Sequence, residues 1–226
     1  MKFFEHYFVQ SFSHLLNFFA AFFHDNYGMS IIVLTILIRC VLLPITINQQ
    51  KTQLQMKKMQ PQLQEIKTKH SSKDPQEQLL LQQELMQLYK QNNFNPLNSG
   101  CLPLLVQMPI LMGFFYAIRG TEEIATHSFL WFQLGTPDPL FILPFLAAFT
   151  TFIQTKALRR GEDSNPTNIK TLMYVMPIMI LFFALKAPAA LVLYWITGNL
   201  FYFLQLYIFS IGPFRKALSL KNEENA

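Results

Sequence analysis

The chain has 226 residues, of which 51% are hydrophobic and only 14% are charged, and it contains 23 phenylalanines. Soluble domains carry about a quarter charged residues, so this composition excludes an ordinary soluble protein and indicates a polytopic membrane protein. The net charge is +5 at pH 7, but the basic residues are scattered over three short loops without a basic face rich in aromatic residues. That distribution excludes nucleic acid as an expected partner.

The first 24 residues are predicted to form an amphipathic helix that lies in the extracytoplasmic interface of the membrane. Apolar side chains recur there at helical spacing, opposite polar ones, at Phe4, Phe8, Phe12, Leu15, Phe19 and Phe22. A signal peptide is the alternative. The sequence shows neither the basic amino-terminal region nor the small-residue cleavage site of such a peptide, which favours the interfacial helix.

Five apolar segments approach the length of about 20 residues that a bilayer core of about 30 Å requires. They are 28–47, 101–118, 140–155, 169–185 and 189–211. We therefore predict an all-α polytopic membrane protein whose five transmembrane helices are formed by residues 25–49 and 100–212. Only Lys186, Ala187 and Pro188 separate the last two segments, so a re-entrant pair is the alternative to two full crossings.

Residues 50–99 form the only long soluble stretch, and we predict a cytoplasmic helical hairpin there. Asp74, Pro75 and Glu77 are typical of a helix start, as cap, first-turn proline and first-turn acid. Two apolar stripes mark the facing sides of the arms: Leu54, Met59, Leu63 and Ile66, then Leu81, Leu85, Leu88 and Tyr89. The hairpin is interpreted as either a solvated connector or a docking surface.

The positions of the lysines and arginines predict the orientation, because short positive loops stay in the cytoplasm. Most of the 18 lie in the hairpin, in the loop at 156–170 and in the tail at 213–226, whereas the opposite side carries Lys2, Arg119 and Lys186. The amino terminus is therefore expected outside, and the carboxyl terminus and the tail are expected in the cytoplasm.

Arg39 lies near the middle of the first apolar segment. An arginine at the centre of a membrane helix costs about 2.5 to 3.5 kcal/mol on insertion scales, so water or a partner carboxylate must offset that cost. All 13 Asp and Glu fall in polar stretches or at segment edges. We therefore expect Arg39 to contact water, or a carboxylate that another molecule brings.

The few other polar side chains of the apolar segments recur at helical spacing, which predicts that they share faces. Thr35, Arg39 and Thr46 fall on one face of the first segment. Further polar positions in the later segments are Gln107, Thr150, Thr151, Gln154, Trp195, Asn199, Tyr202 and Gln205. If these faces converge, they line a hydrated groove. Packing between helices is the alternative role for each threonine and glutamine.

Several kinds of chemistry are not expected. The apolar segments hold no Ser-His-Asp arrangement, no HExxH motif, no paired aspartates and no glycine-rich phosphate loop, so we predict no enzyme and no cofactor. Cys40 and Cys101 and the dispersed histidines lack metal-ligand spacing, so no metal is expected. No internal repeat of the kind that builds transporters is visible.

Three stretches, taken in order, resemble one family. GMSIIVLTILIRCVLLP, QQKTQLQMKKMQPQLQEIK and NPLNSGCLPLLVQMPILMGFFYAI are similar to the YidC/Oxa1/Alb3 membrane protein insertases, and TLMYVMPIMILFFALKAPAALVLYWITGNLF resembles their closing segments. The similarity covers nearly the whole chain. It fits the short form of Gram-positive bacteria, which is usually a lipoprotein. No lipobox is present, so we expect a processed or truncated sequence.

The resemblance implies a five-helix core in the bacterial plasma membrane, with a hydrophilic groove open to the cytosol and to lipid and closed outside. It places the groove arginine at Arg39 and the hairpin at about residues 50 to 92. We assign Thr35, Gln107, Gln154, Trp195 and Asn199 to the lining. The implied partners are lipid and nascent membrane proteins with acidic translocated tails, and docking of a ribosome or Sec translocon stays open.

Two other functions compete with insertion. A small-solute transporter or anion channel would use Arg39 as its substrate site, although repeats and a coupling carboxylate are missing. A structural assembly factor would hold partner subunits without inserting them.

Overall fold

The computed structural model describes residues 10–70, 74–95, 102–158 and 167–210, which form helices, the turns between them and one two-stranded antiparallel sheet. Residues 1–9, Cys101 and the expected tail at 213–226 lie outside the described residues. The chain divides into two compact units, Met1–Leu42 with Pro109–Ala226 and Leu43–Met108. We call them unit 1 and unit 2.

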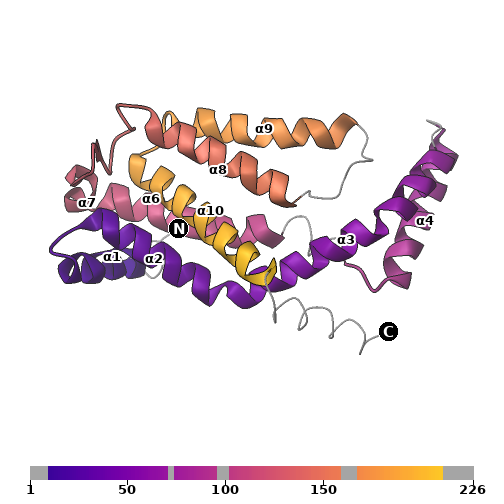
Figure 1. Ribbon diagram of the computed structural model, residues 1–226, viewed down its shortest axis with the longest axis horizontal. Helices are drawn as coiled ribbons and strands as arrows, with labels where there is room; N and C mark the ends of the chain where they lie inside the picture. The colour runs from indigo at the N-terminus through magenta and orange to yellow at the C-terminus, as the bar shows by residue number, and fades with distance from the viewer. Residues whose placement is uncertain (1–9, 71–73, 96–101, 159–166, 211–226) are drawn as a thin grey trace. The chain divides into compact units, whose positions relative to one another are not determined.

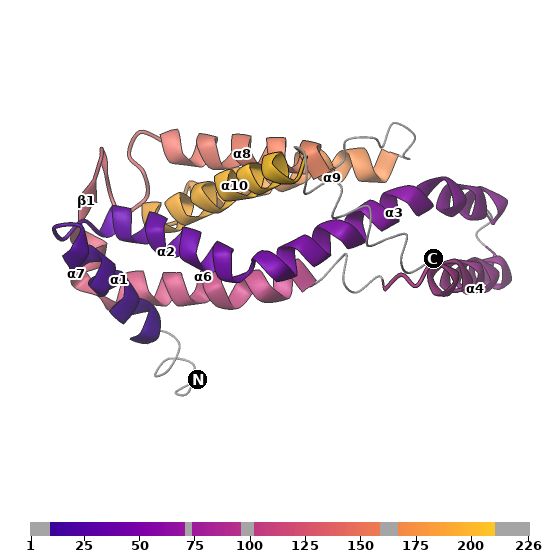
Figure 2. The same ribbon diagram turned by 60° about the horizontal axis from the view of Figure 1, so that its bottom comes forward.

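Unit 1 is a layer of helices packed in a continuous series. Helix α9 (Thr167–Ala184) packs on α8 (Ile142–Leu158), α8 on α10 (Ala189–Ser210), α10 on α2 (Tyr27–Val41), and α2 on α1 (Gln10–Phe22) (Figures 1 and 2). Helix α6 (Leu102–Gly120) joins this series through Phe114, whose ring lies 5.2 Å from that of Phe12 and 4.7 Å from that of Tyr194. Phe114 and Tyr194 are almost completely buried, so this aromatic contact is part of the core.

One helix of the described residues, α10, is by itself long and apolar enough to cross a membrane. Helices α1 and α2 pass the same test only together, and they are bent by 119° at the break between them. His24 and Asp25 make that bend with positive φ angles, which polar residues adopt more readily than bulky ones. The other apolar stretches, within α6, α8 and α9, are shorter, so the number of five crossings stays a prediction.

The first apolar segment is interrupted near its carboxyl-terminal end. Helix α2 ends at Val41, and α3 (Leu43–Lys69) begins two residues later and runs on into the hairpin. Pro44 explains the break, since proline lacks an N–H and its ring clashes with the carbonyl four residues earlier, whereas it fits the first turn of a new helix. Thr46 therefore belongs to α3 and to unit 2.

At one end of unit 1, residues 121–141 form what we call the hairpin cap. It contains α7 (Glu122–Thr126) and a hairpin of β1 (Ser128–Phe129) with β2 (Phe132–Gln133). Ala189 N and Ala190 N at the start of α10 donate to the carbonyl oxygens of Thr136 and Leu134, at 2.8 and 3.0 Å. The cap thus satisfies amide groups that a helix start otherwise leaves unpaired.

Unit 2 contains the predicted hairpin. Helices α3 and α4 (Pro75–Gln91) pack on each other around Met59, Leu63, Leu88 and Phe94, with Met56, Ile66, Leu85 and Tyr89 partly buried beside them. Asp74 is the predicted cap: its carboxylate accepts from Gln76 N at 3.2 Å, and Pro75 begins the helix. Six residues of the two predicted apolar stripes thus belong to the core of this unit: Met59, Leu63, Ile66, Leu85, Leu88 and Tyr89.

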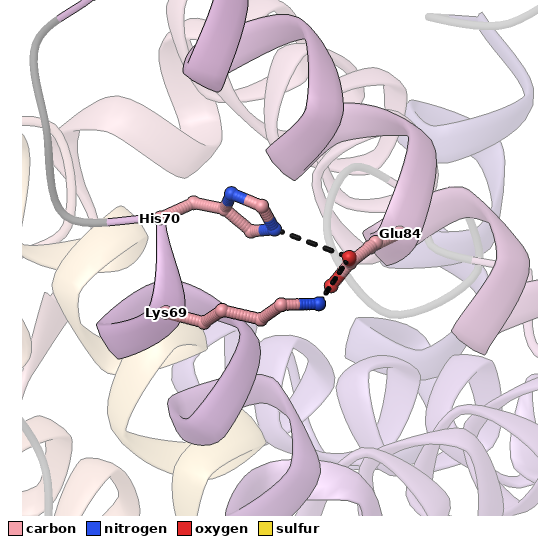
Figure 3. A network of polar contacts seen from close by, with 3 residues as sticks. All are labelled: Lys69, His70 and Glu84. Atoms are coloured by element: carbon pink, nitrogen blue, oxygen red, sulfur yellow. Dashed lines mark hydrogen bonds and ion pairs between the residues drawn. The ribbon is translucent and has the colours of Figure 1, made fainter.

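The two arms also meet through a polar contact where α3 ends. Lys69 Nζ donates to Glu84 Oε1 at 2.7 Å, and His70 Nε2 lies 3.2 Å from the same oxygen (Figure 3). The hydrogen bond from Lys69, followed by the contact with His70, lowers the pKa of Glu84 below its ordinary value of 4.5. A lowered pKa stabilises the folded hairpin above that value, and the contribution is lost as the pH falls through the folded pKa.

Acidification below about pH 4.5 is therefore expected to loosen the tip of the hairpin. Spin labels at Gln62→Cys and Gln83→Cys, two exposed positions on α3 and α4, should report a broader distance distribution below that pH. Glu84→Gln should remove the acid-dependent part of the broadening. Glu65→Gln, at an exposed position on α3, is the matched control, and equal behaviour of the two variants would contradict the assignment.

Candidate functional site

A cluster of hydrogen-bonded polar side chains joins α8 to α10 inside unit 1. Asn199 Nδ2 donates to Thr150 Oγ1 at 3.0 Å and to Thr151 Oγ1 at 3.1 Å, and Trp195 Nε1 donates to Thr151 Oγ1 at 3.1 Å. Thr150, Thr151 and Asn199 are buried, and Trp195 is half-buried. In an apolar environment unpaired donors are costly, so these bonds hold the two helices in one register.

Arg39 of α2 lies against the same part of α10. A Cβ atom placed on Gly198 would be 2.5 Å from Arg39 Nη2 and 3.2 Å from Cζ, so the guanidinium occupies the space that any other residue would fill. Gly198 directly precedes Asn199 and follows Trp195 by one helical turn. The structure therefore brings together Arg39, Trp195 and Asn199, three of the residues predicted to line the groove.

Arg39 is half-buried as a residue, and its guanidinium lies against Gly198. Arginine stays protonated in proteins and presents five N–H donors in a rigid fork that matches a carboxylate. The site thus combines a permanent positive charge with amide and indole groups on the neighbouring helix. It suits the binding of an anionic group more than any reaction with a nucleophile or base.

Thr35 is buried on α2, and its assignment to the lining stays a prediction. It lies one turn from Arg39 on α2, but its side chain is fully buried and its Oγ1 donates to the carbonyl of Ile31 at 2.6 Å. A hydroxyl bonded in this way to its own helix favours the alternative role for Thr35, packing between helices. Thr35 supports the position of Arg39 on α2, and its hydroxyl hydrogen is already used.

The two glutamines predicted for the lining occupy different surroundings. Gln154 is half-buried on α8, one turn beyond the buried threonines. Gln107 is half-buried on α6 and belongs to unit 2, as does Thr46, so its assignment to the lining stays a prediction.

Gly198 is a residue of the candidate site that the sequence did not reveal. A glycine inside an apolar helix often serves only close packing between helices. The space that Gly198 leaves matters here because Arg39, about 160 positions earlier in the chain, fills it. One signal pointed to it: Gly198 interrupts a strongly apolar helix beside the polar face that contains Trp195 and Asn199.

The cluster between α8 and α10 makes a stability prediction. Thr151→Val removes the oxygen that accepts from both Trp195 and Asn199, and we expect it to lower the free energy of unfolding by about 1 to 2 kcal/mol. Titration of the reconstituted protein with denaturing detergent measures this change. Thr155→Val is the matched control, because Thr155 Oγ1 donates only to the carbonyl of Thr151 within its own helix. Equal losses for both variants would contradict a role for the contact between helices.

The comparisons with known proteins agree on one family. The family model described as "60Kd inner membrane protein" matches residues 18–213. "Membrane protein insertase YidC 2" of Bacillus anthracis is 50% identical over 93% of this chain and 82% of its own length. "Membrane protein insertase MisCA" of Bacillus subtilis (strain 168) is 46% identical over 93% of this chain and 80% of its own length.

A solved structure supports the same conclusion. "Active YidC insertase crystal structure with the first transmembrane domain resolved" matches with a TM-score of 0.69 and 28% identity. The match covers 92% of this chain and 47% of that chain, so the chain spans about half of the solved protein. The predicted all-α membrane fold is confirmed by this likeness, and so is the resemblance drawn from the sequence motifs. The chain belongs to the YidC/Oxa1 family of membrane protein insertases.

Proposed function

We propose that the protein is a membrane protein insertase that receives the polar tail of a nascent membrane protein at Arg39 and releases the apolar segment into the bilayer. The observation that carries the proposal is the contact of the Arg39 guanidinium with Gly198 of α10, with Arg39 itself half-buried. The relatives named membrane protein insertase support the same activity.

The first step is capture of the tail. A polar tail crosses about 30 Å of hydrocarbon during insertion, and a hydrated recess at Arg39 shortens that distance. At an intermediate dielectric, between that of the protein surface and bulk water, a carboxylate about 4 Å from the guanidinium gains about 1 to 4 kcal/mol. This energy is large enough to favour acidic tails and small enough to allow release. Trp195 and Asn199 line the α10 side of the recess.

The second step is release into lipid. The apolar segment of the client leaves water for hydrocarbon and gains about 25 cal/mol for each Å² that it buries. For a segment of spanning length that gain exceeds the attraction between one carboxylate and Arg39. The step therefore needs no nucleotide hydrolysis, because the partitioning of the client supplies the free energy.

The proposed topology places the amino terminus outside and the carboxyl terminus in the cytoplasm of a bacterium, with five crossings of the plasma membrane. The hairpin of unit 2 is then cytoplasmic, and the hairpin cap lies on the outer side. Carbonyl groups of the hairpin cap accept hydrogen bonds from the amides at the start of α10. The cap is thereby attached to that end of α10, which supports a recess that is closed on the outer side.

The activity is tested with liposomes that contain this chain as their sole protein. A purified single-spanning client with an acidic tail should become protected from added protease only when the insertase is present. A structural assembly factor would leave the client unprotected. Flux of small anions through the same liposomes without client insertion would favour the transporter.

A further inference from the structure

The hairpin cap carries a group of exposed apolar side chains at its tip and at its return to α8. Leu130 is 73% exposed and Leu140 is 59% exposed, and Trp131, Phe141 and Ile142 are exposed as well. Between Glu123 and Lys156 the sequence has one charged residue, Asp138. Because Asp138 is 2% exposed, the surface of this region displays no formal charge.

The backbone at this surface is unusual. Among the described residues, five that are not glycine have positive φ, and three of them, His24, Asp25 and Asn93, are polar types that tolerate it. The other two are Leu130, with φ of 55°, and Phe141, with φ of 57°. Leu130 is the first of the two turn residues of the β1–β2 hairpin, a place where glycine or asparagine is preferred. Bulky apolar residues thus occupy strained positions where they gain little burial within the protein.

The buried carboxylate of Asp138 holds this surface in place by hydrogen bonds from the protein side. Its Oδ1 accepts from Trp131 Nε1 at 3.0 Å and from Leu140 N at 3.1 Å, and its Oδ2 accepts from Leu143 N at 2.7 Å. The indole N–H of Trp131 is therefore directed toward the protein, and the apolar ring remains at the surface. One buried carboxylate orients both the hairpin tip and the start of α8.

The exposed group continues along a surface that faces lipid in a membrane protein. Helix α8 begins at Ile142, and Phe145, Leu146 and Phe149 on it are all exposed and apolar. The exposed apolar surface is strained, has no charge and continues onto α8. These three features fit contact with the interface of the lipid bilayer, where tryptophan and leucine are favoured. We propose that Leu130, Trp131 and Phe141 insert into that interface and anchor the hairpin cap to the lipid. On the proposed topology this is the outer leaflet.

The anchor is tested by fluorescence in phospholipid vesicles, after Cys40 and Cys101 are replaced by serine. A polarity-sensitive dye on Leu130→Cys should emit at shorter wavelength than the same dye on Glu122→Cys, an exposed position of the same cap. Lipids with a quencher near the head group should quench the first dye at least about threefold more than the second. Iodide, equilibrated on both sides, should show the reverse order. Equal quenching of both dyes by iodide would overturn the proposal, and protection of position 130 from both quenchers would indicate a protein partner instead.

A second variant separates anchoring from folding. Leu130→Gly removes the backbone strain, so the melting temperature in detergent should stay the same or rise. In a Trp195→Phe background, where Trp131 is the only tryptophan, the same change should weaken quenching of Trp131 by the labelled lipids. A lower melting temperature with unchanged lipid quenching would show that Leu130 packs within the protein, and would overturn the anchor. Neither measurement depends on the insertion of a client protein. A negative result would therefore contradict the lipid anchor and would not bear on the proposed insertase function.

Discussion

Arg39→Ala is expected to reduce the insertion of clients with acidic translocated tails by about tenfold, which corresponds to about 1.4 kcal/mol of lost attraction. The physical reason is the loss of the one permanent positive charge in the first apolar segment. Protease protection of the client in proteoliposomes measures the effect. The variant should fold, because replacing a half-buried arginine with alanine removes an insertion cost and leaves the core of unit 1 unchanged.

Two controls make the result specific to charge. Arg39→Lys should retain most of the insertion, since lysine keeps the charge while it loses the planar fork of arginine. A client whose tail contains no acidic residue should insert equally well with Arg39 and with alanine at that position. If the alanine variant inserts the acidic client at the normal rate, charge capture is absent for that client.

Gly198→Leu is expected to impair insertion about as strongly as loss of the arginine itself. The leucine side chain would occupy the space that the guanidinium fills, so Arg39 would be displaced from α10 while its charge remained in the chain. Gly198→Ala should have a smaller effect, because the atoms that its Cβ would meet belong to the flexible end of a long side chain. Insertion of the acidic client is again the measurement.

Gly120→Ala is the matched control for these changes, since a Cβ placed at Gly120 meets no atom within 4 Å. It should insert clients normally. The double variant Arg39→Ala with Gly198→Leu should be no worse than either single one, because both act on the same contact. Additive losses would show that Gly198 has a role separate from Arg39.

The sequence predicted the features that local rules determine. Apolar length identified the helices α2, α6, α8, α9 and α10, and the cap of α4 at Asp74 follows from residue types within one helical turn. The facing stripes of the α3–α4 hairpin followed from helical periodicity. These predictions were reliable because each depends on residues close together in the chain.

Features that depend on distant residues could not be read in the same way. The contact between Arg39 and Gly198 exists only after α2 packs on α10. Thr46 shares a helical pattern with Arg39 in the sequence, but it belongs to the other unit, as does Gln107. The β1–β2 hairpin was also missed. Its strands have only two residues each, which is too short for an alternation of apolar and polar residues to be recognised. Its turn residues are Leu130 and Trp131 in place of the usual Asn-Gly, so the turn sequence does not predict a hairpin either.

Chemical modification at position 39 tests the proposed hydrated receptor most directly. With Cys40 and Cys101 replaced by serine, Arg39→Cys would be treated with membrane-impermeant thiosulfonates, one cationic and one anionic, and Phe149→Cys on the exposed apolar surface of α8 serves as control. The cysteine at 39 should react much faster than the control. The cationic adduct should restore insertion of the acidic client, whereas the anionic adduct should depress it further. A cysteine that reacts no faster than the control, or adducts of opposite charge with equal effects, would contradict a water-filled, positively charged site at Arg39.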